Sequence, residues 1–401
     1  MVVATVGAVI AAVAYERAEY ERFGRDRWRH TPEAGLAIQH VRVFDSETGI
    51  VRSGQTVLVV ADRIQAVGAD TVVRVPANAE VIDGTGQMVV PGLFDMHVHL
   101  QPRSGPGYIA AGVTTVRDMG NQRDRLLALK RQWDLGDEVG PRILLAGPIS
   151  NMGKGVKATT EQEAQRAIEE YAWSGYEQIK IHASTYPPAF VTLIANASHE
   201  KGLRVSGHVP FGMKAEQFVN AGIDEIQHMQ FVVENFLPAG LTDDAAAEAS
   251  ASLDLESASV ARFIGLLKQK HIVIDPTMNA LEHQYAARHP RYYQTTRAML
   301  KRLYDADVPL VIGTDAPAKP GSSLHHEMEI WAGVGIPPTK ILQIATIRAA
   351  RVMRADAATG SIRIGKQADL LIVAGDPTQD VSNIRNGRFV VKGGLVYPIV
   401  P

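Results

Sequence analysis

The feature that most constrains the fold of this chain is the alternation of strand-like and helix-like segments between residues 91 and 356. This order is typical of βα units built around a parallel sheet. Eight strands are expected, at residues 93–100, 114–119, 142–146, 178–182, 204–209, 225–229, 271–277 and 310–315. Helices are expected between them, among others at residues 123–133, 161–172, 189–201 and 214–221. Eight such units fit a (β/α)8 TIM barrel, for which ~250 residues are typical.

Both ends of the chain have a different pattern, made of short strands and turns. The apolar runs at residues 57–60 and 370–373 indicate buried strands, and Asp83-Gly84 and Asn386-Gly387 are dipeptides typical of tight turns. Residues 36–90 and 357–401 are each too short to make a comfortable domain alone. We therefore expect one small β-sandwich assembled from these two segments, beside a barrel formed by residues 91–356.

Charge and cysteine content exclude several functions. The 401 residues include 41 Lys and Arg against 43 Asp and Glu, which gives a formal charge of -2 and argues against a nucleic-acid binder. Because the chain has no Cys, disulfides, iron–sulfur clusters, cysteine-ligated zinc and a cysteine nucleophile are excluded. The 13 His leave imidazole and carboxylate as the available metal ligands.

Residues 1–35 are expected to form an N-terminal helical segment with an apolar part and a charged part. Residues 2–14 are uncharged and mostly apolar, and a helix of that length spans ~20 Å, less than the ~30 Å hydrocarbon core of a bilayer. The length suits a signal peptide, and Ala12-Val13-Ala14 resembles a cleavage site. We expect an export signal or a membrane-contacting anchor, and so an exported, periplasmic or membrane-anchored protein, with an ordinary helix of a cytoplasmic protein as the alternative.

One connection within the expected barrel is long. Residues 231–270 include a stretch rich in Ala, Ser, Glu and Asp at residues 243–259. It is expected to form either a helical lid over the barrel mouth or a plain pair of surface helices.

The first expected barrel strand carries a pair of histidines. Side chains alternate along a strand, so His97 and His99 point to one face while Met96 and Val98 point to the other. Two imidazoles with this spacing can chelate one metal ion from inside the barrel. A random His-x-His is more often a pair of hydrogen-bonded histidines, but this pair lies where the expected barrel begins.

Four more side chains that can bind metal or react lie at the ends of later strands, namely Lys180, His208, His228 and Asp315. His182 should face the same way as Lys180. Active sites of TIM barrels lie at the C-terminal ends of the strands, so these side chains are expected to meet the histidine pair at the barrel mouth. A lysine buried there is costly as an ammonium ion and needs a chemical reason.

Taken together, the motifs resemble those of the metal-dependent amidohydrolase superfamily. Residues 91–99, PGLFDMHVH, are similar to its PG-hydrophobic-x-D-x-H-x-H signature. The likeness continues through residues 111–118, 207–210, 313–316 and 365–370, and so covers nearly the whole chain from about residue 36. Within the superfamily, the chain most resembles the imidazolonepropionase-like, prolidase-related branch.

The resemblance implies that two divalent metal ions are held by six side chains, namely His97, His99, Lys180, His208, His228 and Asp315. The more buried ion would take the first two histidines and the aspartate, and the second ion the other two histidines. Lys180, N-carboxylated by CO2, would bridge both ions. Ligands without sulfur suit Zn²⁺, with Mn²⁺, Co²⁺ or Fe²⁺ as alternatives.

The resemblance also implies a reaction, the hydrolysis of an amide C–N bond by a metal-bridging hydroxide. Asp315 would act as general base toward the hydroxide and as general acid toward the leaving amine. The substrate would be a small molecule, either a dipeptide, an N-acyl amino acid or a cyclic amide, and homo-oligomers are expected as in relatives.

The chain departs from the prolidase-like pattern after the third strand. Residues 146–152 read AGPISNM, where those relatives carry Gly-Gly-His, and this puts specificity for dipeptides in doubt. We expect His182 to contact the substrate or to support the site, and Arg117 and His325 are further candidate substrate contacts.

Three alternatives remain open. A mononuclear deaminase or imidazolonepropionase would leave Lys180 unused, and such deaminases usually carry a Glu where this chain has Phe211. A lactonase would use the same hydroxide on an ester. A metal-free interaction scaffold is the third alternative, although such relatives typically lose metal ligands and this chain keeps each expected one.

Overall fold

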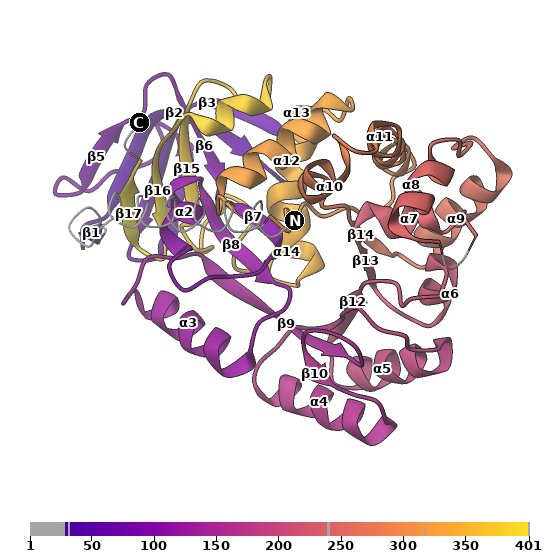
Figure 1. The fold of residues 1–401 in the computed structure, drawn as a ribbon. Coiled ribbons are helices and arrows are strands. Elements are labelled where there is room, and N and C mark those ends of the chain that lie inside the picture. The colour runs from indigo at the N-terminus through magenta and orange to yellow at the C-terminus, as the bar shows by residue number, and fades with distance from the viewer. Residues whose placement is uncertain (1–28, 31–32, 239–240, 317, 400–401) are drawn as a thin grey trace.

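The computed structural model describes residues 29–30, 33–238, 241–316 and 318–399. The expectations for residues 1–28 therefore lie outside the described chain. Two sheets organise what is described: a parallel sheet that forms the barrel, and a second sheet built from both ends of the chain (Figure 1).

The barrel sheet follows the order β14-β13-β12-β11-β9-β8-β7, and its neighbours pair in parallel. Its strands are β7 (Leu93–Val98), β8 (Val113–Asp118), β9 (Arg142–Ser150), β11 (Gln178–Ile181), β12 (Arg204–Gly207), β13 (Glu225–Gln227) and β14 (Val273–Asp275). A short strand, β10 (Val156–Lys157), pairs with β9. Each of these seven longer strands matches one of the expected segments.

The eighth expected strand closes the barrel without forming a regular strand. Val311 N donates to Ile274 O at 3.1 Å on one side of this segment. On the other side Met96 N donates to Ile312 O at 2.9 Å, and Asp315 N donates to His97 O at 2.8 Å. Residues 310–315 thus join β14 to β7, and the predicted TIM barrel is confirmed.

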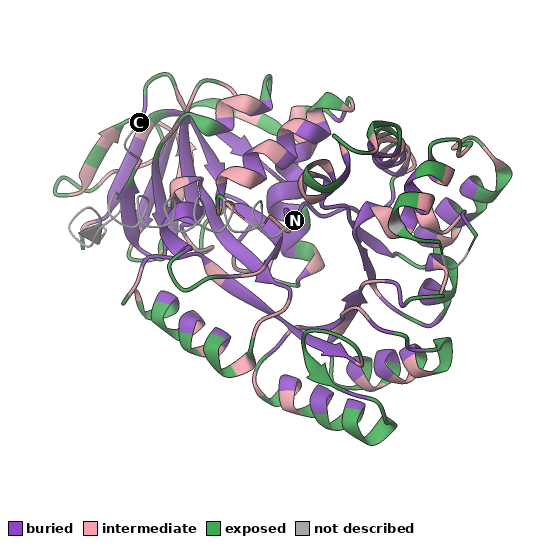
Figure 2. Ribbon diagram, viewed as in Figure 1, coloured by how far each residue is buried: buried purple, intermediate pink, exposed green. Residues whose placement is uncertain are grey.

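Helices surround the barrel with their buried sides on the strands, which are almost entirely buried, and their exposed sides toward solvent (Figure 2). They are α2 (Gly105–Ala110), α3 (Arg123–Leu135), α4 (Glu161–Trp173), α5 (Pro188–Glu200), α6 (Ala215–Asn220), α7 (Met229–Glu234), α8 (Asp243–Ser250), α9 (Ala258–Gln269), α10 (Met278–Tyr285), α11 (Pro290–Asp305), α12 (Ser322–Gly333), α13 (Pro338–Gln343), the π-helical η1 (Ile344–Arg348) and α14 (Ala349–Val352). Local sequence sets their ends: α4 starts at a capping box of Thr160 and Glu163.

The second sheet, called the terminal sheet below, has the order β1-β17-β16-β15-β6-β2-β3-β4, with β5 paired to β2. Its strands are β1 (Arg29–His30), β2 (Leu36–Asp45), β3 (Ile50–Val60), β4 (Arg63–Ala69), β5 (Glu80–Asp83), β6 (Gln87–Pro91), β15 (Leu370–Ala374), β16 (Gly387–Lys392) and β17 (Leu395–Pro398). The 3₁₀ turn η2 (Val381–Arg385) lies between β15 and β16. As expected, residues from both chain ends combine in one unit.

Strand alternation divides the terminal sheet between two cores. Leu370 and Ile372 belong to a core formed within the terminal sheet itself, which also takes in residues of β2, β3, β16 and β17. Leu371 and Val373, between and after them, belong to the main core shared with the barrel. A single sheet therefore encloses a sandwich-like core on one face and packs against the barrel with the other.

The long connection of residues 231–270 contains the end of α7 and the whole of α8 and α9. In Figure 1 these helices lie on the side of the barrel opposite the terminal sheet. Among the described residues, no helix is long and apolar enough to cross a membrane.

Candidate metal centre

Six of the predicted side chains converge at the C-terminal edge of the barrel strands, namely His97, His99, Lys180, His208, His228 and Asp315. A carboxylate oxygen of Asp315 lies 3.2 Å from His99 Nε2 and 3.7 Å from His97 Nε2. Lys180 Nζ lies 3.3 Å from His97 Nε2. The Nε2 atoms of His208 and His228 are 2.9 Å apart, and His228 Nδ1 lies 3.9 Å from Asp315. The six residues come from five different segments of the chain, with His97 and His99 on the same one, and meet in one place.

Hydrogen bonds at Nδ1 orient two of these imidazoles. His97 Nδ1 lies 2.9 Å from Asp275 Oδ2, and His99 Nδ1 lies 3.3 Å from Gly120 O. Because carboxylate and carbonyl oxygens only accept, we assign the ring hydrogen to Nδ1 in both residues. Each Nε2 then keeps its lone pair and faces the cluster, which is the arrangement of a histidine that binds metal.

Burial shifts the site's nitrogen bases toward their neutral forms. Burial lowers the pKa of His97 and His208 well below the usual range and that of His228 to about 4. Burial also lowers the pKa of Lys180, which is fully enclosed, to about 8. Only neutral imidazoles and amines offer a lone pair, so this environment favours metal binding and reaction of the lysine with electrophiles.

The pKa of Asp315 is also lowered, but against the effect of burial. Burial raises its pKa, but the neighbouring His99, His228 and Lys180 side chains outweigh burial and lower the pKa to about 2. The carboxylate is thus ionised at neutral pH. His97, His228 and Asp315 bring one potential ligand atom each to within 4.8 Å of one another.

The backbone is strained where the site is built. His228, Thr277 and Asp315 have φ values of 67°, 47° and 44°, a region that non-glycine residues rarely adopt and that is most unfavourable for a β-branched threonine. Thr277 Oγ1 lies 2.8 Å from His228 Nδ1, so this strained turn contacts the cluster directly. Glu327 on α12 holds the turn by accepting from Met278 N and Asn279 N, at 2.9 and 2.5 Å.

Below the cluster, a buried polar network fills the barrel. Arg117 makes a bidentate pair with Glu225, at 2.5 and 2.8 Å, and its Nε donates to Met96 O at 2.7 Å. Its Nη2 lies 3.5 Å from Asp275, the partner of His97. Arg117, Glu225 and Asp275 have no solvent exposure. The ion pair therefore supports the carboxylate that orients a predicted ligand.

Two expected substrate contacts are not placed at the site. Arg117 is enclosed beneath it with its guanidinium engaged by Glu225, so it does not face the barrel mouth. His325 is buried on α12, where Nε2 donates to Ala111 O at 2.8 Å, and it packs against the segment between α2 and β8. The residue of that helix that supports the cluster is Glu327, through the turn at residues 277–279, and the sequence analysis did not single it out.

His182 does lie next to the cluster. Its ring centroid is 4.8 Å from that of His208, and its buried Nδ1 has no hydrogen-bond partner among the described residues. It remains a candidate substrate contact.

Asp275 and Glu225 were also missed, although the sequence carried a signal for both. Each falls within an expected barrel strand, Glu225 at the start of one and Asp275 near the end of another. A charged residue at an inward position of a barrel strand needs a partner. Pairing these acids with Arg117 would have predicted the network.

A cavity of about 620 Å³ adjoins the cluster on the side of His208 and His228. Its walls come from the loop after β12, from α7, from residues just before and within α8, and from α10. The long connection therefore contributes to the site, with Leu241 and Ala246 among the lining residues.

A TIM barrel with such a cluster and cavity at the C-terminal edge of its strands has the architecture of a barrel enzyme. The chain belongs to the amidohydrolase family, whose sequence model matches residues 88–396. The predicted superfamily is therefore confirmed, and the protein is accordingly a hydrolase acting on carbon–nitrogen bonds. Metal binding is typical of this family.

Individual relatives are distant or match only locally. The chain is 22% identical over 392 residues to an imidazolonepropionase of Symbiobacterium thermophilum, covering 83% of this chain and 89% of that protein. It is 56% identical to a dihydroorotase of Geotalea daltonii over 66 residues, only 16% of this chain and 15% of that enzyme. The structure resembles that of a Xaa-Pro dipeptidase with bound methionine in its active site, with a TM-score of 0.73, 21% identity, and coverage of 91% and 100% of the two chains. This last likeness concerns the fold.

Proposed function

We propose that this protein is a binuclear metal-dependent hydrolase that cleaves an amide C–N bond. The observation that carries the proposal is Lys180, a fully buried lysine whose Nζ lies 3.3 Å from His97 Nε2 in a cluster of four histidines and an aspartate. A structural lysine would be paired or would reach solvent. Carboxylation by CO2 would convert the amine into an anion with two oxygen donors, and the lowered pKa of Lys180 supplies the neutral amine that this reaction needs.

The donor set fits two divalent ions. His97 and His99, with their Nδ1 atoms engaged, present Nε2 toward Asp315 and would hold one ion with that carboxylate. His208 and His228, whose Nε2 atoms face each other, would hold the second. Nitrogen and oxygen donors without sulfur suit Zn²⁺, with Mn²⁺, Co²⁺ or Fe²⁺ as alternatives.

When bound, such ions polarise a carbonyl oxygen and lower the pKa of a shared water from ~15.7 toward ~7. The chain's own residues do the rest. Asp315, ionised at neutral pH, would take a proton from the water and pass it to the leaving amine, which makes it the general base and acid. Asp275 would keep His97 in one tautomer throughout.

The mononuclear alternative is less well supported. It would leave Lys180 buried without a chemical role, and Phe211 stands where a deaminase of this superfamily usually carries a glutamate. A lactonase would differ in substrate and not in the site.

The test is Lys180→Ala, with Lys392→Ala as the matched control because Lys392 is also a buried lysine but lies in the terminal sheet. We expect metal analysis of the purified wild type to give two ions per chain. Lys180→Ala should lose one or both, and its kcat/KM on amides should fall at least ~1000-fold, about 4 kcal/mol of transition-state stabilisation.

Lys392→Ala should keep both ions and the activity. Added propionate should restore part of the activity of Lys180→Ala, because a carboxylate can supply the missing oxygen donors. Full activity in Lys180→Ala would refute the bridging role.

A further inference from the structure

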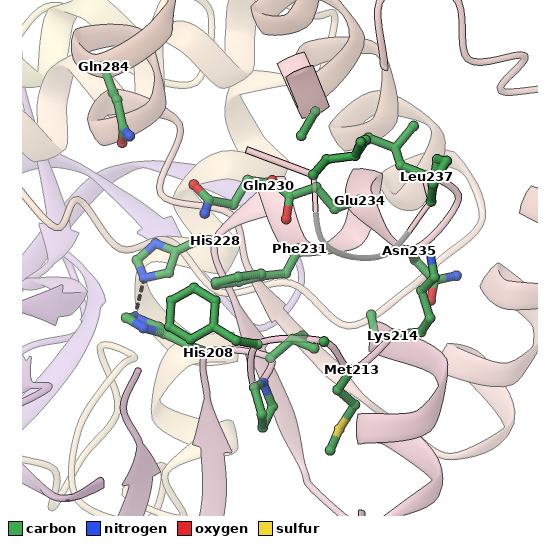
Figure 3. A pocket seen from close by; sticks show the side chains of 18 residues that line it. His208, Met213, Lys214, His228, Gln230, Phe231, Glu234, Asn235, Leu237 and Gln284 are labelled. Atoms are coloured by element: carbon green, nitrogen blue, oxygen red, sulfur yellow. Dashed lines mark hydrogen bonds between the residues drawn. The ribbon is translucent and has the colours of Figure 1, made fainter. Parts of the chain in front are cut away.

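The cavity beside the candidate metal centre has an aromatic inner end. The ring of Phe231 on α7 lies 5.6 Å from that of His208 and 6.1 Å from that of His228. Figure 3 shows Phe231 directly beside the two imidazoles, with the cavity extending away toward Asn235 and Leu237. A group bound against Phe231 would therefore lie next to the reacting bond.

A second phenylalanine lines the same cavity and is exposed. Phe211, in the loop after β12, has 65% of its surface open to solvent, although its backbone is fixed by a hydrogen bond from Phe211 N to Ser184 O at 2.8 Å. The free energy is lowered when an apolar ligand covers an exposed aromatic side chain at a cavity beside a catalytic cluster. Met213, Leu237 and Leu241 add further apolar surface to the walls.

The charges in the cavity balance. Among the described lining residues, the formally charged side chains are one cation, Lys214, and one anion, Glu234. Burial lowers the pKa of Lys214, while the negative charge of Glu234 raises it, so the two side chains interact electrostatically. None of these lining residues is an arginine. A substrate carboxylate entering the cavity would thus compete with Glu234 for the lysine, because the described lining offers no second cationic side chain.

We propose that the substrates of this enzyme are neutral amides that carry an aromatic or similarly bulky apolar group, which binds between Phe231 and Phe211. This rests on the proposed amide hydrolysis and narrows its substrate class, since it places dipeptides and N-acyl amino acids, with their free carboxylates, below neutral aryl amides. The cavity of about 620 Å³ has room for a ring, because binding sites for ring-containing ligands commonly measure ~300–1,000 Å³.

The experiment compares four probes on the metal-loaded protein: acetanilide, benzamide, acetamide and N-acetylglycine. Burial of one ring should raise kcat/KM of the better aryl amide about 50-fold over that of acetamide. N-acetylglycine should be no better than acetamide. Phe211→Ala should lower the ratio of kcat/KM for the aryl amide to that for acetamide about tenfold.

Trp173→Ala is the matched control, because Trp173 on α4 is another aromatic residue, 92% exposed, that does not line the cavity. It should leave the ratio unchanged. A second readout needs no turnover: calorimetric binding of N-phenylmethanesulfonamide, which has the shape of an aryl amide but is not hydrolysed. Its Kd should rise about tenfold in Phe211→Ala and stay constant in Trp173→Ala.

The outcomes separate this inference from the proposed function. A preference for N-acetylglycine, or a substrate ratio and a sulfonamide Kd that do not respond to Phe211→Ala, would overturn the substrate class while amide hydrolysis stood. If no amide were hydrolysed but the sulfonamide still bound tenfold less tightly to Phe211→Ala, the cavity would keep its aryl preference and the hydrolase proposal would fail.

Discussion

The interior of the barrel and the interior of the terminal sheet differ in the polarity of the side chains that they enclose. The core within the terminal sheet is a cluster of apolar side chains, such as Val89, Ile372 and Val391, each without solvent exposure. The barrel interior encloses charged ones that are equally inaccessible, among them Arg117 and Glu225.

This difference separates stability from function. Burying apolar surface stabilises a fold in proportion to area, whereas burying an ion pair contributes little and can cost free energy relative to apolar packing. The barrel retains buried charges beneath the candidate metal centre, whereas the described core within the terminal sheet is an apolar cluster. We infer that the charges serve to position the site and that the terminal sheet serves to stabilise the chain.

The largest effect on stability is expected from breaking the buried pair. Arg117→Met leaves Glu225 buried without its bidentate partner and removes the guanidinium that faces Asp275. The free energy of unfolding should fall by about 4 kcal/mol, measured by urea denaturation, and metal affinity should fall with it.

The control is the double variant Arg117→Met, Glu225→Met. Replacing both charges with apolar groups removes the unpaired anion, so this protein should be more stable than the single variant while still binding metal weakly. A double variant less stable than the single one would contradict the view that the pair is kept for positioning.

A substitution in the terminal sheet should give the reverse pattern. Ile372→Ala removes apolar groups from the fully buried core of the sheet and should lower the free energy of unfolding by about 3 kcal/mol. Metal content and kcat/KM at a temperature where the variant is folded should match the wild type. A loss of bound metal at that temperature would mean that the two regions are coupled.

The sequence predicted the barrel and the terminal sheet to different extents. The barrel strands could be found because each is a short apolar run in regular alternation with helices, and the ligands because each lies at the end of such a run. The terminal sheet was recognisable from strand and turn patterns, although a single sheet enclosing its own core could not be told from two.

The supporting residues were harder to find, because their roles depend on contacts between distant segments. Arg117 and His325 carried polar groups in suggestive positions, but only the fold reveals that one pairs with Glu225 and the other with Ala111. The left-handed backbone of Thr277 and the hydrogen bonds of Glu327 that hold the turn have no local sequence signature. Tertiary packing determines both the backbone conformation of Thr277 and the hydrogen bonds of Glu327.

The smallest predicted effect concerns the hydrogen bond that joins the buried charges to the candidate metal centre. Asp275→Asn keeps the shape of the side chain that accepts from His97 Nδ1 at 2.9 Å but removes its charge. Such partners of ligand histidines contribute about 10–100-fold to metal affinity, so the metal dissociation constant should rise by that factor. The matched control is Asp369→Asn, another buried aspartate, which pairs with Arg142 at 3.2 Å beside the terminal sheet and should change stability but not metal affinity. Equal weakening of metal binding by both variants would show that any buried charge matters to the site, and would remove the distinction between the two interiors.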